Sequence, residues 1–223
     1  MSELESPIWS ALQTEQARFA ERDGDAARFP PAVTALAGLR ETTAAALASL
    51  GRLMRRGETV GVFLDQPLAM PPGIALVDTA DVLQMLHDGA TPAIATGIEL
   101  LGDADMHAMI ALADATRPGP FSTRTAELGT FLGIRVGGRL AAMAGQRMRL
   151  PGLVEISAVC TDPAHAGHGY AASLVQAQLA LIHRGGHGAF LHVRADNARA
   201  IGLYERLGFR GSRTFRYSVL RAA

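Results

Sequence analysis

The chain has 223 residues, of which 48% are hydrophobic and 19% are charged, and 21 basic residues balance 21 acidic ones. This composition predicts a folded protein with one large or two small domains. Because there is no net charge and no block of like charge, nucleic acid is not expected as a general partner.

Proline-containing breaks divide the first hundred residues into short segments rich in alanine and leucine. Residues 32–54 predict one or two helices, residues 59–64 a buried strand, and residues 81–87 a short helix or a strand. Turn-forming residues then favour a domain boundary near residue 95. We therefore expect a small N-terminal α/β region of unknown role, 1–95, and a second domain, 96–223.

The second half has a clearer order of elements. Asp103 or Asp105 can cap a first helix, Gly137-Gly138 suits a two-residue hairpin turn, and Asn197 can cap a late helix. The predicted elements are a helix at 103–115, strands at 131–136, 139–150 and 153–161, a helix at 171–183, a strand at 190–194, a helix at 197–207 and a strand at 214–220.

The segment between the third of these strands and the second helix has the features of an anion site. It contains Gly167 and Gly169 and leads directly into the start of a helix. Unpaired backbone N–H groups and the positive end of the helix dipole meet there, and glycine lets phosphate oxygens approach the backbone. The loop therefore indicates phosphate binding, although a simple tight turn can have the same glycines.

The same glycines fit a second type of phosphate site. Gly167, Gly169 and Ala172 satisfy the dinucleotide fingerprint G-x-G-x-x-A, with Asp196 as a conceivable ribose ligand. That fingerprint usually follows the first strand of a parallel sheet, whereas only ~50 residues follow here and the preceding strands form antiparallel hairpins. A nucleotide oxidoreductase is therefore the weaker interpretation.

Two separated segments, 162–171 and 197–209, together resemble motifs of the GNAT superfamily of N-acetyltransferases. In that superfamily the coenzyme A loop follows Q/R-x-x-G-x-G/A, and the second motif is approximately N-x-x-A-x-x-L-Y-x-x-x-G-F. The resemblance covers roughly residues 98–220. It implies an α/β (α+β) fold in which helices flank a mixed, mostly antiparallel central sheet. The most similar group consists of predicted acetyltransferases with an additional N-terminal region.

The resemblance implies a binding site for acetyl-CoA along the strand, the loop and the second motif. Val159 and Thr161 would offer backbone groups to the acetyl and pantetheine groups, and the loop would hold the pyrophosphate. Ala166 replaces the Gln or Arg of the pattern and His168 stands where a basic residue is common, so we expect weaker coenzyme affinity. The implied contact residues are Val159, Cys160, Thr161, Ala166, Gly167, His168, Gly169, Tyr170, Ala171, Asn197 and Tyr204.

Acyl transfer to an amine needs a neutral amine, a stabilised oxyanion and a proton for the departing thiolate. By resemblance, Glu155 is the candidate base, acting through water, and Tyr204 is the candidate acid beside the coenzyme sulfur. Alternatives stay open, because Glu155 could face solvent or pair with an arginine, and Tyr204 could belong to the helix core.

The implied reaction moves an acetyl group from acetyl-CoA to a primary amine of a small molecule, peptide or protein by direct attack in a ternary complex. The alternative is a catalytically inactive acyl-CoA-binding regulatory module. The N-terminal region could complete the acceptor pocket, mediate formation of a homodimer, or be a degenerate half of the same fold.

Cysteine and histidine usage argues against a metal site. Cys160 is the single cysteine, and the seven histidines show no metal-ligand spacing, so we predict no metal and expect most histidines at the surface. No apolar run reaches the ~18 residues of a membrane span, and acidic residues stand where a secretory signal would be basic. We therefore expect a cytoplasmic protein without a membrane partner.

Overall fold

The structure is a computed structural model, and it describes residues 3–64, 69–92 and 96–223. The strands of a large sheet are β4 (Thr59–Leu64), β5 (Ile74–His87), β6 (Glu99–Leu101), β7 (Phe131–Val136), β8 (Arg139–Leu150), β9 (Leu153–Thr161), β10 (Gly188–Arg194) and β11 (Phe209–Ala222). A small sheet contains β1 (Glu21–Asp23), β2 (Ala26–Arg28) and β3 (Ala37–Leu39). The helices are α1 (Pro7–Gln13), α2 (Ala44–Leu53), α3 (Met106–Thr116), α4 (Tyr170–Arg184) and α5 (Ala198–Arg206), with short 3-10 turns η1 (Ala17–Phe19), η2 (Asp103–Asp105), η3 (Thr125–Leu128) and η4 (Pro163–His165).

The large sheet is mixed and mostly antiparallel, as the resemblance implies. Its strands follow the order β4-β11-β5-β10-β9-β8-β7-β6. β10 runs parallel to β9, and the other neighbouring pairs in the described part of the chain are antiparallel. The small sheet is antiparallel, in the order β1-β2-β3. The predicted fold class is therefore confirmed.

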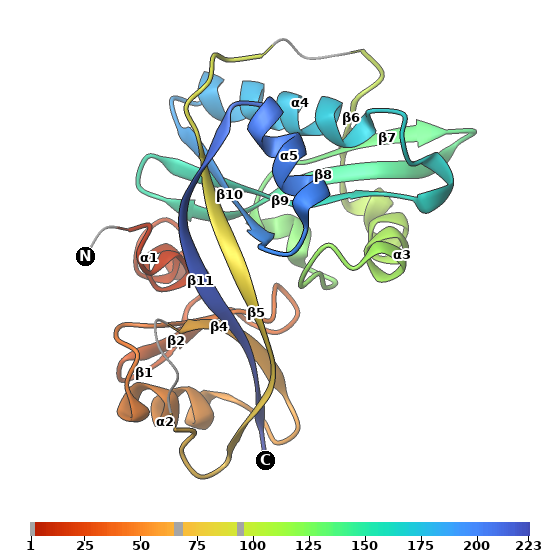
Figure 1. Cartoon of the computed structure of the whole chain (residues 1–223). Coiled ribbons are helices and arrows are strands. Elements are labelled where there is room, and N and C mark those ends of the chain that lie inside the picture. The colour runs from red at the N-terminus through yellow and green to blue at the C-terminus, as the bar shows by residue number, and fades with distance from the viewer. Residues whose placement is uncertain (1–2, 65–68, 93–95) are drawn as a thin grey trace.

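Helices cover both faces of the large sheet (Figure 1). On one face, Ile156 of β9 is buried in a core cluster with Leu179 of α4, and α5 adds to the same cluster. On the other face, Met148 of β8 is buried with Leu12 of α1, and α3 lies farther along that face, where its Met109 is buried. The sheet therefore lies between two layers of helices, α4 and α5 on one face and α1 and α3 on the other.

The N-terminal and C-terminal regions share the large sheet. β5 lies between β10 and β11, pairing with β10 from Val82 to Leu86 and with β11 along its whole length. In Figure 1, β5 and β11 form a long ribbon that connects the small sheet and α2 with α4 and α5. The predicted boundary near residue 95 falls at residues 93–95, outside the described residues, and stays a prediction. Strands on either side of it are hydrogen-bonded to one another.

Sequence patterns placed most elements of the second half correctly, with the predicted bounds for β7, β8 and β9. The helix predicted within residues 32–54 is wrong for its first part, because residues 37–39 form β3 and α2 begins only at Ala44. Residues 37–39 are extended where α1 lies close against them. A Cβ atom on Gly38 would lie 2.3 Å from the backbone nitrogen of Trp9, so α1 packs directly on the backbone of this strand.

Candidate active site

β9 and β10 separate along their length, and the opening between them is the centre of the candidate site. Parallel pairing begins at Leu153 and ends where Ile156 meets Leu191. Beyond that pair, β9 continues to Thr161 and β10 to Arg194 without pairing to each other. Backbone N–H and C=O groups that face the opening are therefore available to an extended ligand, which can bind as an added strand does.

A bulge in β9 lies beside the opening. Gly145 of β8 pairs with Ser157 and Met143 with Cys160, so β9 has an extra residue between these pairs. Ala158 has a φ of 52°, a left-handed conformation that is rare for a residue with a side chain. Such strain clusters at functional sites, and here it turns the backbone in the segment where the acetyl group is predicted to bind.

The loop after β9 leads to an exposed helix start. The Asp162 carboxylate accepts a hydrogen bond from the Ala164 N–H at 2.9 Å and fixes the turn η4. Gly167 and Gly169 have φ of 86° and 78°, and a Cβ atom on either would meet no atom within 4 Å. Across the described residues, no backbone carbonyl accepts a hydrogen bond from the N–H groups of residues 167–172. This open loop at the start of α4 fits a phosphate group.

The side chains of the loop add little positive charge. The His168 ring stacks on Tyr170 with 5.5 Å between ring centroids, and its Nδ1 lies 3.1 Å from the His165 carbonyl oxygen. Ala166 is exposed, and Ala171 is half-buried in the first turn of α4. A phosphate in this loop would therefore be held mainly by backbone N–H groups and the helix terminus.

Tyr204 of α5 lies at the opening, on the face that carries α4. Its side chain is buried in one cluster with Ile156 of β9 and Val193 of β10. Burial, together with the nearby Cys160 thiol, raises the pKa of the Tyr204 hydroxyl to about 12. This hydroxyl therefore keeps its proton at neutral pH, as a general acid must. Burial also raises the pKa of Cys160 to about 11, so its thiol is not a nucleophile at neutral pH.

The other predicted coenzyme contacts lie around the same opening. Val159 is half-buried against clusters that include α4, and Thr161 pairs with Ala142 on β8. Asn197 is exposed, and its Oδ1 accepts a hydrogen bond from the Ala200 N–H at 3.1 Å. The predicted capping role of Asn197 is therefore confirmed, and its contact with the coenzyme stays a prediction.

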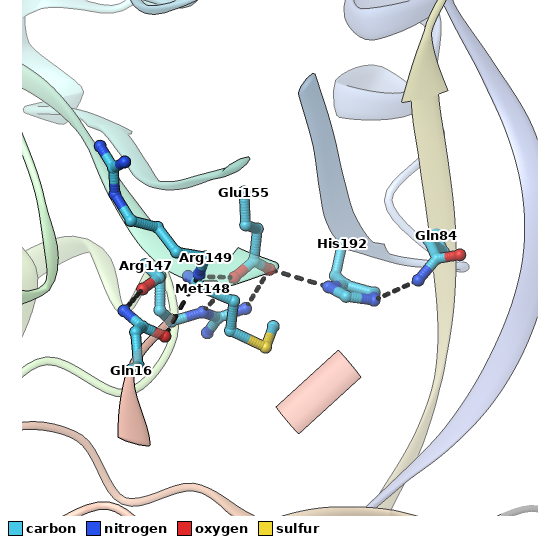
Figure 2. A network of polar contacts seen from close by, with 7 residues as sticks. All are labelled: Gln16, Gln84, Arg147, Met148, Arg149, Glu155 and His192. Atoms are coloured by element: carbon cyan, nitrogen blue, oxygen red, sulfur yellow. Dashed lines mark hydrogen bonds and ion pairs between the residues drawn. The ribbon is translucent and has the colours of Figure 1, made fainter. Parts of the chain in front are cut away.

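Glu155 is fully buried, with a side chain that is 0% exposed. Alternate residues of β9 face α4, so Glu155 points to the face that carries α1 and α3. Its carboxylate binds the Arg147 guanidinium at 2.6 and 2.8 Å and accepts a hydrogen bond from His192 Nδ1 at 2.8 Å (Figure 2). The Gln84 amide nitrogen lies 3.2 Å from His192 Nε2 and 3.2 Å from the Leu4 carbonyl oxygen.

Ion pairing decides the charge of Glu155. Burial alone would raise the pKa of this carboxyl, but the Arg147 guanidinium and the His192 N–H together lower it from 4.5 to about 2. A carboxylate with this pKa accepts a proton poorly at neutral pH. The geometry therefore favours the arginine-pairing alternative over the predicted role as the base, and direct solvent contact is excluded by the burial.

A second bulge, in β8, places Arg147 beside Glu155. Between Gln146 and Arg149, β8 has one residue more than the facing stretch of β9. The side chains of two consecutive residues therefore turn to the face that carries α1, where Met148 joins the core and Arg147 binds Glu155.

The N-terminal region holds both ends of this polar network. The Gln16 amide nitrogen donates to the Arg147 carbonyl at 2.7 Å, and its oxygen accepts from the Arg149 N–H at 3.2 Å. At the other end, the Gln84 amide nitrogen contacts His192 Nε2, as Figure 2 shows, and donates to the Leu4 carbonyl. The bulge and the histidine are thus both fixed by residues from the first hundred.

Sequence patterns identified Glu155 but not its partners. His192 is an exception to the expectation that most histidines lie at the surface, because its side chain is 3% exposed. Its place between apolar residues of β10 is the signal that could have put it inside. The pairing of Arg147 with Glu155 depends on the bulge in β8, which no local sequence pattern predicts.

The structure also bears on the dinucleotide and metal sites considered above. Asp196, the conceivable ribose ligand, is ion-paired with Arg194 at 2.7 Å. Within residues 3–64, 69–92 and 96–223, no group of three or more His, Cys, Asp or Glu side chains is placed to hold a metal ion. In the same ranges, no helix is both long and apolar enough to cross a membrane.

Comparisons with known proteins bear on the family and the fold. A family model described as FR47-like protein matches residues 131–218. A protein assigned to the GNAT family of acetyltransferases, from Novosphingobium aromaticivorans DSM 12444, has a crystal structure that is 38% identical in sequence, with a TM-score of 0.94 and 100% of both chains covered. A GCN5-related N-acetyltransferase from Kribbella flavida is 18% identical, with a TM-score of 0.61 and 96% of this chain and 95% of its own chain covered. No curated protein matches the chain.

The full-length identity of 38% shows that the chain belongs to the GNAT family of acetyltransferases. Because 100% of both chains is covered, the N-terminal region is part of the matched structure. The more distant protein from Kribbella flavida shows the shared fold alone. Membership of the family implies acetyl-CoA as the acyl donor.

Proposed function

We propose that this acetyltransferase moves the acetyl group of acetyl-CoA to a primary amine of a small molecule, peptide or protein, by direct attack in a ternary complex. The observation that carries the proposal is the opening between β9 and β10, which leads to the glycine loop at the start of α4. An extended pantetheine arm in this opening would meet backbone groups of Val159 and Thr161, and its pyrophosphate would meet residues 167–171.

We assign Tyr204 as the general acid. In the reaction, the amine nitrogen attacks the thioester carbon, the carbon–sulfur bond breaks, and the departing thiolate takes a proton. The Tyr204 hydroxyl is buried at the opening and is protonated at neutral pH, because burial raises its pKa to about 12. The tyrosinate that forms regains a proton from solvent.

We assign Glu155 a structural role in the site and not the role of base, because its carboxylate is buried and bound by Arg147 and His192. The proton that the amine loses then passes to water, so the rate should follow the ionisation of the acceptor amine. If the chemical step limits turnover, the rate should rise with pH toward the pKa of that amine. The raised pKa of Tyr204 places loss of the acid near pH 12, beyond this rise.

Tyr204→Phe tests the acid directly, since it removes the hydroxyl and keeps the ring in the core. We expect kcat to fall by ~100-fold, with little change in the acetyl-CoA dissociation constant. Turnover is measured by thiol release over a panel of amines, binding by calorimetry, and folding by thermal denaturation. Wild-type turnover in a stably folded variant would remove Tyr204 from the mechanism.

One observation favours a second candidate, an acyl-CoA-binding module without catalysis. Ala166 is exposed and brings no charge to the loop. Ala166→Arg should tighten coenzyme binding by ~10-fold, because a charge-assisted hydrogen bond to phosphate adds ~1.5 kcal/mol. Tight binding of acetyl-CoA without thiol release on any amine would favour the module over the enzyme.

A further inference from the structure

The hydrogen bond between Glu155 and His192 lies where β9 and β10 separate. The last parallel pair of these strands is Ile156 with Leu191, and His192 is the next residue on β10. The bond, 2.8 Å long, therefore connects the two strands across the end of their paired segment. A contact at this point can determine how far the paired segment extends.

The bond is the middle of a longer polar chain. Arg147 on β8, Glu155 on β9, His192 on β10 and Gln84 on β5 connect adjacent strands, with contacts between 2.6 and 3.2 Å. The side chains of Arg147, Glu155 and His192 are 12%, 0% and 3% exposed, and Gln84 is buried. Because little water can replace these contacts, this series of side-chain contacts should hold the four strands in a fixed arrangement.

The orientation of Gln84 determines the tautomer of His192. The amide nitrogen of Gln84 donates to the Leu4 carbonyl, so it also faces His192 Nε2 as a donor. His192 Nε2 must then accept, and the ring proton lies on Nδ1, which donates to Glu155. Both ring nitrogens are thus used within the protein, and neither is available to a substrate.

We propose that His192 is a positioning residue for acyl transfer, because its hydrogen bond to Glu155, supported by Gln84, sets where β9 and β10 separate. The inference rests on the proposed function, in which acetyl-CoA lies in this opening. A thioester displaced by ~1 Å can lose ~100-fold in rate. The N-terminal region then has a role in the reaction, since it supplies the strand and the amide that hold His192.

Three substitutions of His192 separate the hydrogen bond from the ring. Asn places an amide nitrogen near the position of Nδ1, Gln places one near Nε2, and Leu has no donor. We expect kcat/KM for acetyl-CoA to fall by ~10- to 100-fold in the Leu and Gln variants. The Asn variant should stay within ~3-fold of wild type, because it alone keeps a donor toward Glu155.

Gln178→Leu is the matched control. Gln178 is buried, and its amide binds Gln146 and the carbonyls of Thr130 and Ala144 at 2.9 to 3.0 Å, on the face that carries α4. Its replacement should lower the melting temperature and leave kcat/KM for acetyl-CoA within ~3-fold. If His192→Leu does not fold, Gln84→Leu removes the support instead, and kcat/KM should fall by ~3- to 10-fold.

Calorimetry of wild type with acetyl-CoA keeps the two proposals apart. Absence of binding would overturn the proposed function. If wild type binds and turns over, and stably folded Leu and Gln variants keep its kcat/KM, then His192 has no positioning role. An equal loss in the Leu, Gln and Asn variants would also overturn the inference, because the ring and not the hydrogen bond would then matter.

Discussion

Two buried polar networks lie on opposite faces of the sheet at β8, and they differ in charge. On the face that carries α1, the Arg147–Glu155 ion pair and the hydrogen bond from His192 to Glu155 form an ion-paired network. On the face that carries α4, Gln146 donates to Gln178, which donates in turn to backbone carbonyls; Arg149 donates to Gln146, and this amide network is called neutral because it holds no ion pair among the described residues. A neutral network loses only hydrogen bonds when it is cut, whereas an ion-paired one is left with a buried charge. The ion pair of Arg147 and Glu155 lies beside the point where β9 and β10 separate.

Arg147→Met should give the largest effect on stability. It leaves the Glu155 carboxylate buried beside His192 without its main partner. We expect the free energy of unfolding at pH 7 to fall by ~3–5 kcal/mol, measured by urea denaturation. Adding Glu155→Leu to Arg147→Met should recover much of the loss, because no unpaired charge remains. A double variant as unstable as the single one would contradict this account.

Acid should weaken the ion-paired network and spare the neutral one. The pKa of Glu155 is lowered from 4.5 to about 2 in the folded state, so the folded chain binds this proton less readily than the unfolded chain does. The pairing thus contributes ~3 kcal/mol above pH ~4.5, and this contribution is lost as pH falls toward ~2.

Urea denaturation of wild type and Glu155→Gln at pH 7 and pH 3 measures that contribution. The difference in stability between the two proteins should shrink by ~2 kcal/mol at the lower pH. Gln178→Leu should keep the same difference from wild type at both pH values, since amides do not titrate. If the difference in stability between wild type and Glu155→Gln is the same at both pH values, the Glu155 carboxylate is not ion-paired in solution.

Local sequence patterns predict the strands and the start of α4 better than they predict the ion-paired network. Period-two patterns placed β7, β8 and β9, and Gly167 with Gly169 located the helix start, because these signals are local. The partners of Glu155 were missed because they depend on register. One additional residue in β8 turns Arg147 to the same face as its neighbour, and alternation predicts the opposite.

The sequence also did not predict which strands pair when they lie far apart in the chain. β5 pairs between β10 and β11, more than a hundred residues away in the chain, and no pattern in residues 74–87 specifies these partners. The left-handed backbone of Ala158 was equally hidden, because such conformations are usually signalled by glycine. The residues that position the opening are therefore fixed by tertiary structure.

Gln178→Leu should be less destabilising than Arg147→Met. The variant removes a buried amide and leaves the carbonyls of Thr130 and Ala144 without its hydrogen bonds, but no charge is left unpaired. We expect the free energy of unfolding to fall by ~1–3 kcal/mol in urea denaturation. A loss as large as that of Arg147→Met would mean that hydrogen-bond number, and not charge, distinguishes the two faces.

Arg149→Met should give the smallest effect, and it pairs with Arg147→Met as the same substitution two positions along β8. Arg149 is half-buried, and its Nη2 donates to Gln146 Oε1 at 3.2 Å. Among the described residues it has no carboxylate within ion-pair distance. Its removal therefore breaks a single side-chain hydrogen bond and leaves no buried charge behind, so we expect a loss of ~0.5–1.5 kcal/mol in the same urea measurement. Equal losses for the two arginines would show that removal of a positive charge from β8, and not the buried pairing with Glu155, sets the cost.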